Sequence, residues 1–194
     1  FHAAERIWFF GVGASLLVAL KAANKFLRIE PKAYCVQDTH TQAMVAATMR
    51  PGEAAVVFSY SGATKDSIHV AELAKHAGAK VICITHFAKS PLTAFADLVL
   101  LCGSEEGPLQ GGSASAEIGQ LFLVDLLCTE YYRRYYDACS KNNEKHPSLY
   151  WINCTRLGCP KAMKDDGLLV RRPTARCTAR QNQTIFCNRK TDLI

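Results

Sequence analysis

The sequence lacks an apolar run long enough to cross a lipid bilayer. Its longest uncharged apolar stretch, Ile7 to Leu20, has 14 residues including two glycines, whereas a membrane-spanning helix needs about 20 apolar residues. There is also no basic leader followed by a small-residue cleavage site, the pattern of a secretory signal. These absences favour a cytoplasmic protein without a membrane partner.

Two nucleotide-binding motifs are missing as well. No GxxxxGK[ST] sequence occurs, which excludes a P-loop. A GxGxxG dinucleotide fingerprint starting at Gly11 would need Gly or Ala at position 16, where the chain has Leu16. Asp38 follows the second predicted strand, where an acid that binds ribose would lie, but it stands 27 residues beyond Gly11. Dinucleotide binding is therefore an alternative with little support.

Paired metal ligands are absent too. Four of the nine cysteines lie near the C-terminus, separated by 4, 17 and 9 residues, unlike the CxxC pairs of zinc sites: Cys154, Cys159, Cys177 and Cys187. The odd count and the missing secretory signal favour a reducing compartment over a disulfide framework. The sequence predicts no metal site and no cofactor.

The excess of positive charge is confined to the end of the chain. Residues 146–194 contain nine Lys and Arg against three Asp and Glu, which is the entire net charge of +6, while residues 1–145 contain 14 of each. The basic character therefore does not indicate a nucleic-acid-binding domain. We predict a domain over residues 1–140 and an irregular basic tail over 141–194, either an extension or non-native sequence, with a second folded domain as the alternative.

The composition of the chain, 194 residues with 49% hydrophobic and 21% charged, is typical of a soluble globular domain. Five apolar runs have the length and composition of buried strands: Ile7–Phe10, Ala33–Val36, Ala54–Ser59, Lys80–Thr85 and Leu98–Leu101. Helical patterns alternate with them, including a short helix at 90–96 and a long one at about 113–136. The sequence thus predicts a doubly wound, flavodoxin-like α/β fold with five parallel strands in the order 2-1-3-4-5 and helices on both faces.

Hydroxyl residues and glycines follow two strands that this order makes neighbours. The segments are Gly11–Ser15 after the first strand and Ser59–Thr64 after the third, at the point where such folds bind ligands. Helix N-termini and hydroxyl donors favour an anion there, and we predict phosphate binding. The candidate binding residues are Gly13, Ser15, Ser59, Ser61, Gly62 and Thr64. Alternatively, Ser15 and Thr64 simply cap helices without a ligand.

Four motifs resemble those of a known family: FGVGAS at 10–15, DTHTQ at 38–42, SYSGAT at 59–64 and SPL at 90–92. They look like the sugar isomerase (SIS) domain, and more narrowly the C-terminal SIS domain of RpiR/MurR-type bacterial transcription regulators. The resemblance covers about residues 3–140. It implies a phosphosugar ligand, with Ser59, Ser61 and Thr64 at the phosphate and Ser15 nearby. It also implies a homodimer or homotetramer, and DNA binding only through an N-terminal helix-turn-helix domain that this chain lacks.

The resemblance leaves an enzymatic alternative open. SIS isomerases generally use a glutamate near the last helix, often with a histidine, because aldose–ketose isomerisation needs a base that moves a proton between carbons. Candidates are Glu105, Glu106, Glu117, His40 and His86. An arginine is common in the regulators where this chain has Glu117. We predict a phosphosugar-binding effector domain without catalytic residues; the alternative is a phosphosugar isomerase that uses Glu117 and His40.

Overall fold

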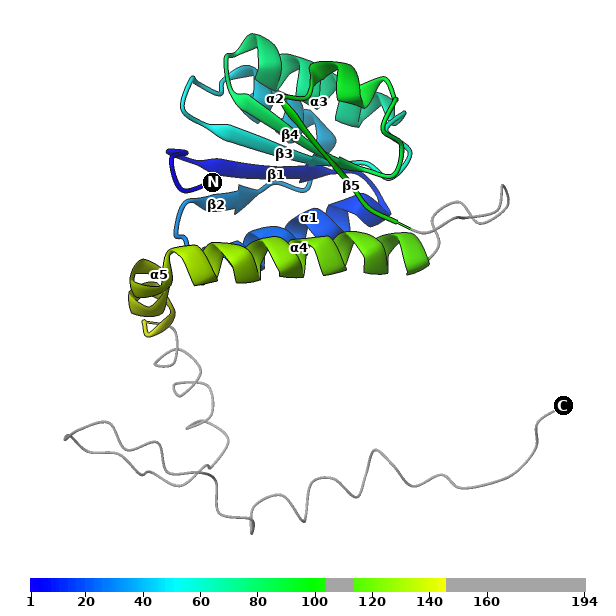
Figure 1. Ribbon diagram of the computed structural model, residues 1–194. Helices are drawn as coiled ribbons and strands as arrows, with labels where there is room; N and C mark the ends of the chain where they lie inside the picture. Colours follow the sequence, from blue (N-terminus) through cyan, green and yellow to red (C-terminus); the bar gives the residue numbers. More distant parts are fainter. Residues whose placement is uncertain (104–113, 146–194) are drawn as a thin grey trace, which may run out of the picture. The chain divides into compact units, whose positions relative to one another are not determined.

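A parallel sheet of five strands organises the part of the chain that the computed structural model describes, residues 1–103 and 114–145. The strands are β1 (Ile7–Gly11), β2 (Ala33–Cys35), β3 (Ala54–Phe58), β4 (Lys80–Thr85) and β5 (Leu98–Leu101). Their order is β2-β1-β3-β4-β5, and every neighbouring pair is parallel (Figure 1). The predicted fold and strand order are confirmed. All described residues lie in one compact unit.

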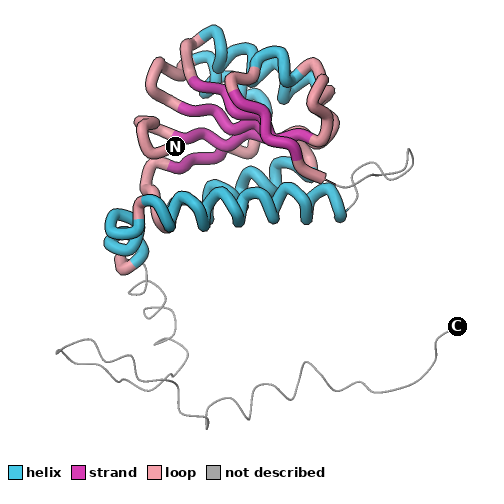
Figure 2. The backbone as a smooth tube through the Cα atoms, in the orientation of Figure 1, coloured by secondary structure: helices cyan, strands magenta, loops and turns pink. Residues whose placement is uncertain are grey.

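Helices cover both faces of the sheet. The helices α1 (Ala14–Leu27) and α4 (Ala114–Arg134) pack on one face, and α2 (Thr39–Ala47) and α3 (Lys65–His76) pack on the other (Figures 1 and 2). The strands all run in the same direction. The helix that follows a strand therefore leads the chain back to the end of the sheet where the next strand begins, as right-handed crossovers require.

Two helices differ from their predicted form. The helix expected at 90–96 is a single 3-10 turn, η1 (Leu92–Phe95). The long helix ends at Arg134 because Tyr135 leaves helical geometry with φ −122° and ψ 42°, and a separate helix, α5 (Tyr136–Asn143), follows. The predicted start of the long helix, Ser113, and the predicted tail from residue 146 onward lie outside the described residues.

Alternating side chains of the central strands pack into two separate hydrophobic cores, one on each face of the sheet. Phe58 and Ile84 face α1 and α4, whereas Val57 and Cys83 face α2 and α3. Successive side chains of a strand point to opposite faces, so a sheet covered on both sides needs apolar residues at every position. Burial of each large side chain contributes about 1.5–3 kcal/mol. This double core explains why the strands read as continuous apolar runs.

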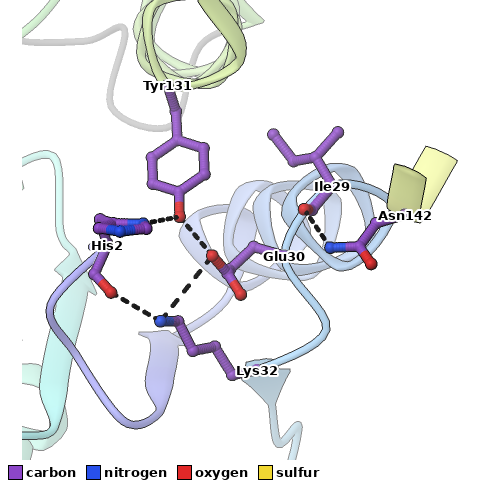
Figure 3. Close-up of polar contacts among 6 residues, drawn as sticks. All are labelled: His2, Ile29, Glu30, Lys32, Tyr131 and Asn142. Atoms are coloured by element: carbon purple, nitrogen blue, oxygen red, sulfur yellow. Dashed lines mark hydrogen bonds and ion pairs between the residues drawn. The ribbon is translucent and has the colours of Figure 1, made fainter. Parts of the chain in front are cut away.

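A polar network joins three segments at the end of the sheet where the strands begin: the N-terminal segment, the connection between α1 and β2, and α4 (Figure 3). The Tyr131 hydroxyl on α4 donates to the Glu30 carboxylate and accepts from Nδ1 of His2 at 3.4 Å. The Lys32 ammonium donates to the His2 carbonyl at 2.8 Å and lies 3.8 Å from the Glu30 carboxylate. Burial and the neighbouring Glu30 carboxylate raise the pKa of Tyr131 above its usual value. The network holds the end of α4 against the N-terminal segment.

At the opposite edge, the buried amide of Gln42 joins the ends of two strands. Its Nε2 donates to the carbonyls of Gly11 at 2.9 Å, Val36 at 3.1 Å and Gln37 at 3.3 Å. The side chain is 1% exposed. This contact fixes the carboxyl end of β1, from which the first hydroxyl-rich loop departs, against the segment that follows β2.

We expect Gln42→Leu to lower the free energy of unfolding by about 2 kcal/mol, because it leaves buried carbonyls without a donor. Urea unfolding measures this. Gln37→Ala changes an exposed neighbour and should stay within about 0.5 kcal/mol of the wild type. Equal stability of Gln42→Leu and the wild type would show that the amide does not stabilise this edge.

Candidate functional site

The two hydroxyl-rich loops lie side by side at the carboxyl edge of the sheet. β1 pairs with β3 so that Gly11 lies opposite Phe58, the last residues of the two strands. Gly13 is the residue that precedes α1, and Ser15 is the second residue of that helix. The helices that follow the loops, α1 and α3, pack on opposite faces of the sheet, which makes this place the switch point at which doubly wound folds bind ligands.

Two hydroxyls near the β3–α3 loop make no hydrogen bond to the helix that follows. Ser59 is 2% exposed, and no described residue bonds its Oγ. Thr64 stands at the N-cap position of α3, yet its side chain makes no capping hydrogen bond. Ser61 is exposed, and its Oγ accepts from the Ala63 N–H at 3.2 Å.

Helix capping therefore does not explain these residues. Thr64 occupies the predicted N-cap position of α3 but makes no side-chain capping bond, whereas Ser15 lies inside α1 rather than at its cap, so the capping prediction is wrong for Ser15. Burying a hydroxyl without a partner costs about 1–3 kcal/mol. A ligand or a water molecule between the two hydroxyl-rich loops would supply the partner that Ser59 lacks.

Gly62 gives the loop its shape. Its φ is 63°, and a Cβ there would lie 2.2 Å from Oγ of Ser90 and 3.1 Å from Oγ1 of Thr85. The Gly62 carbonyl accepts from the Leu92 N–H at 3.0 Å. Oγ of Ser90 is itself buried, and no described residue bonds it. The loop is thus held closely against the segment that follows β4, and only glycine fits at its centre.

An aromatic stack closes the side of the site toward β5. The rings of Tyr60 and His86 are 5.0 Å apart and 14° from parallel. Gly103, with φ 118°, lies against both rings, since a Cβ there would be 2.6 Å from Cε2 of Tyr60 and 2.9 Å from Nδ1 of His86. Gly119 on α4 packs in turn on Gly103, where a Cβ would come within 3.1 Å of the Gly103 Cα. The start of α4 is therefore part of this wall.

The two residues of the isomerase alternative lie on helices that cover opposite faces of the sheet. His40 is exposed in the first turn of α2, and Glu117 is half-buried in the first turn of α4. The helix α2 packs with α3 on one face, and α4 packs with α1 on the other. Glu105 and Glu106 lie outside the described residues.

Within residues 1–103 and 114–145, no three His, Cys, Asp or Glu side chains are grouped as metal ligands. No helix of the same residues has the length and hydropathy of a membrane span. The cysteines spaced near the C-terminus lie outside the described part.

A cavity of about 730 Å³ lies at the end of the sheet where the strands begin, beside Phe1, Ala54 and Lys80. It is away from the hydroxyl-rich loops, which follow the other ends of the strands.

Comparison with known proteins identifies the domain. The family model for the SIS domain matches residues 1–130, which include both hydroxyl-rich loops. The chain belongs to the SIS domain family. This confirms the resemblance that the four sequence motifs indicated.

Relatives of this SIS domain are bacterial transcription regulators. The chain is 41% identical over 124 residues to an uncharacterized HTH-type transcriptional regulator of Caldanaerobacter subterraneus, covering 64% of this chain and 44% of the relative. It is 38% identical over 125 residues to the HTH-type transcriptional regulator RpiR of Escherichia coli, covering 64% and 42%. The chain thus spans less than half the length of the curated relatives it matches.

Solved structures share the fold. The NanR protein of Vibrio vulnificus, complexed with ManNAc-6P, is 37% identical with a TM-score of 0.69, and the match covers 76% of this chain and 57% of NanR. The sugar isomerase domain of an RpiR transcription factor from Sphaerobacter thermophilus has a TM-score of 0.67 at 21% identity, covering 76% and 80%. The second likeness supports the fold alone.

We expect Gly62→Ala to destabilise the SIS domain more than Gly52→Ala. Both positions have positive φ, 63° and 94°, which costs a residue with a Cβ about 1–2 kcal/mol. Only at Gly62 does the Cβ also collide with Ser90, whereas the nearest atom at Gly52 is 3.7 Å away. Overpacking adds about 1–3 kcal/mol, measurable by urea unfolding. Equal losses in the two variants would contradict the close contact between the loop and Ser90.

Proposed function

We propose that this SIS domain is the effector-sensing part of an RpiR-type transcription regulator and that it binds a sugar phosphate. The observation that carries the proposal is the buried Oγ of Ser59, which lacks a described partner at the switch point of the sheet. The regulator relatives and the ManNAc-6P complex of NanR, 37% identical to this chain, support the same ligand class.

Phosphate binding would use both loops. Ser59, Ser61 and Thr64 offer hydroxyl donors, and Ser15 offers another from the first turn of α1. The free N–H groups and positive dipole ends of α1 and α3 favour an anion between them. Gly13 and Gly62 would let the backbone approach the phosphate closely, since neither has a Cβ.

Sensing rather than turnover fits the separation of the isomerase candidates. Isomerisation needs a base and a second proton-handling group on one substrate. His40 and Glu117 stand on helices that cover opposite faces of the sheet. The isomerase alternative therefore has less support than the effector domain, and we infer a domain that works without a metal or cofactor.

DNA contact in the parent regulator would belong to a helix-turn-helix domain outside this chain. The relatives are HTH-type regulators, and the match covers only 42–44% of their length. A regulator that responds to a sugar phosphate and acts on bacterial DNA works in the cytoplasm, which is the location we propose.

An apolar stripe on α4 supports a homodimer or homotetramer. Ile118, Phe122 and Leu126 recur at every fourth position, so they line one side of the helix, and they are 65%, 70% and 54% exposed. Contiguous exposed apolar side chains of this kind mark interfaces in soluble proteins. We propose that a second copy of the chain covers them.

We expect a sugar phosphate at 100 times its dissociation constant to stabilise the domain by about 2.7 kcal/mol, seen as a raised Tm. The corresponding unphosphorylated sugars should give no shift. Ser59→Ala should raise the stability of the free domain, because it removes a buried hydroxyl without a described partner, and should weaken ligand binding about tenfold.

The matched control is Ser67→Ala. Ser67 is also a buried serine whose hydroxyl lacks a described partner, but it lies inside α3 rather than on the loop. Its replacement should leave the ligand-induced shift unchanged. No stabilisation by any sugar phosphate would overturn the proposed function, and product formation from a bound sugar phosphate would favour the isomerase alternative.

Phe122→Glu should break the assembly by placing a charge in the apolar stripe. Light scattering coupled to size exclusion would give two or four times the chain mass of 21.3 kDa for the wild type and a lower multiple for the variant. Met44→Glu, at a comparably exposed apolar residue on α2, should leave the mass unchanged. A monomeric wild type would contradict the proposed assembly.

A further inference from the structure

We propose that His86 recognises the sugar part of the bound sugar phosphate through its Nε2, while the hydroxyl-rich loops hold the phosphate. The proposal rests on the proposed function, because it assigns sugar recognition within the same site. It concerns a residue whose role the sequence motifs leave open.

His86 lies directly beside the loop that carries the candidate phosphate-binding serines. β3 and β4 pair with Phe58 opposite Ile84, and the pairing continues past the strand ends. The Ser59 N–H donates to the Ile84 carbonyl at 3.1 Å, and the His86 N–H donates to the Tyr60 carbonyl at 3.0 Å. The backbone at position 86 is therefore fixed to the phosphate loop itself.

Three contacts fix the imidazole ring. It stacks on Tyr60 at 5.0 Å and 14°, its edge meets the ring of Phe87 at 84°, and its Nδ1 lies 3.3 Å from the Cys102 carbonyl. Gly103 lies against the ring, since a Cβ built there would be 2.9 Å from Nδ1. The ring is thus oriented before any ligand binds, which lowers the entropic cost of binding.

The Cys102 contact favours a proton on Nδ1. A backbone carbonyl only accepts hydrogen bonds, so Nδ1 donates, and when the ring is neutral Nε2 is an acceptor. The two nitrogens lie at different positions on the ring, so Nε2 is not engaged by the Cys102 carbonyl. Within the described residues, Nε2 has no hydrogen-bond partner.

The polarity of Nε2 selects the sugar rather than the phosphate. Phosphate oxygens accept hydrogen bonds, and Nε2 does too when the ring is neutral, so in that form the two do not pair. A sugar hydroxyl can donate to Nε2, whereas Ser59, Ser61 and Thr64 can all donate to the phosphate. His86 is therefore a specificity residue. The serines and threonine bind the phosphate that all sugar phosphates share, and His86 distinguishes their hydroxyl arrangements.

Two substitutions separate the nitrogens of the ring. In His86→Asn the side-chain amide can still donate to Cys102 but no longer reaches the Nε2 position. His86→Gln places a polar group near the Nε2 position and gives up the Nδ1 geometry. Both variants would be measured as full chains by calorimetry, with N-acetylmannosamine 6-phosphate, glucose 6-phosphate and fructose 6-phosphate as probes, and by ³¹P NMR titration with inorganic phosphate.

For the tightest-binding sugar phosphate of the three, we expect His86→Asn to lose affinity about tenfold and His86→Gln to stay near the wild type. Inorganic phosphate should bind both variants as it binds the wild type. Unchanged sugar-phosphate affinity in His86→Asn would overturn the proposal. A larger loss in His86→Gln than in His86→Asn would overturn it too, because His86 would then act only through Cys102.

Failure of the proposed function gives a different result. If the site does not hold phosphate, the wild type binds neither inorganic phosphate nor any of the three sugar phosphates, and Ser59→Ala changes nothing. If only the His86 inference fails, the wild type binds, Ser59→Ala weakens binding of every probe, and the two His86 variants bind as the wild type does.

Discussion

The parallel pairing of β1 with β3 is the contact on which the candidate site depends. It brings Gly11 level with Phe58, so the loops that follow the two strands begin side by side. The helices that follow the loops, α1 and α3, lie on opposite faces, so their N-termini both lie at the switch point of the sheet. Any other neighbour for β1 would separate the two hydroxyl-rich loops, and neither loop alone surrounds an anion.

Polar side chains at the two ends of the strands differ in how they are paired. Where the strands begin, polar side chains satisfy one another, as Tyr131, Glu30, His2 and Lys32 do (Figure 3). Where the strands end, the Ser59 hydroxyl stays without a described partner. A hydroxyl left unpaired costs stability and keeps a donor available for a ligand, which is the usual exchange between stability and binding.

The helix α4 reaches both edges. Its first turns pack through Gly119 on Gly103 and so on the wall formed by Tyr60 and His86. Its last turns join the N-terminal segment through the hydrogen bond that Tyr131 accepts from His2. A ligand changes a distant contact only if it binds two states of the protein differently, and α4 is the described element that contacts both the site wall and the N-terminal segment.

The strands, their order and the two loops follow from the sequence, because apolar runs, glycines and hydroxyls are local patterns that crossover rules turn into a topology. Which hydroxyls stay unpaired depends on the folded structure: Thr64 has the sequence context of a cap and makes no capping bond. Tyr60 and His86 stand 26 residues apart, so their stack depends on the register of β3 and β4. The placement of His40 and Glu117 on opposite faces likewise follows from the packing of α2 and α4, because contacts between distant residues are set by packing and not by spacing along the chain.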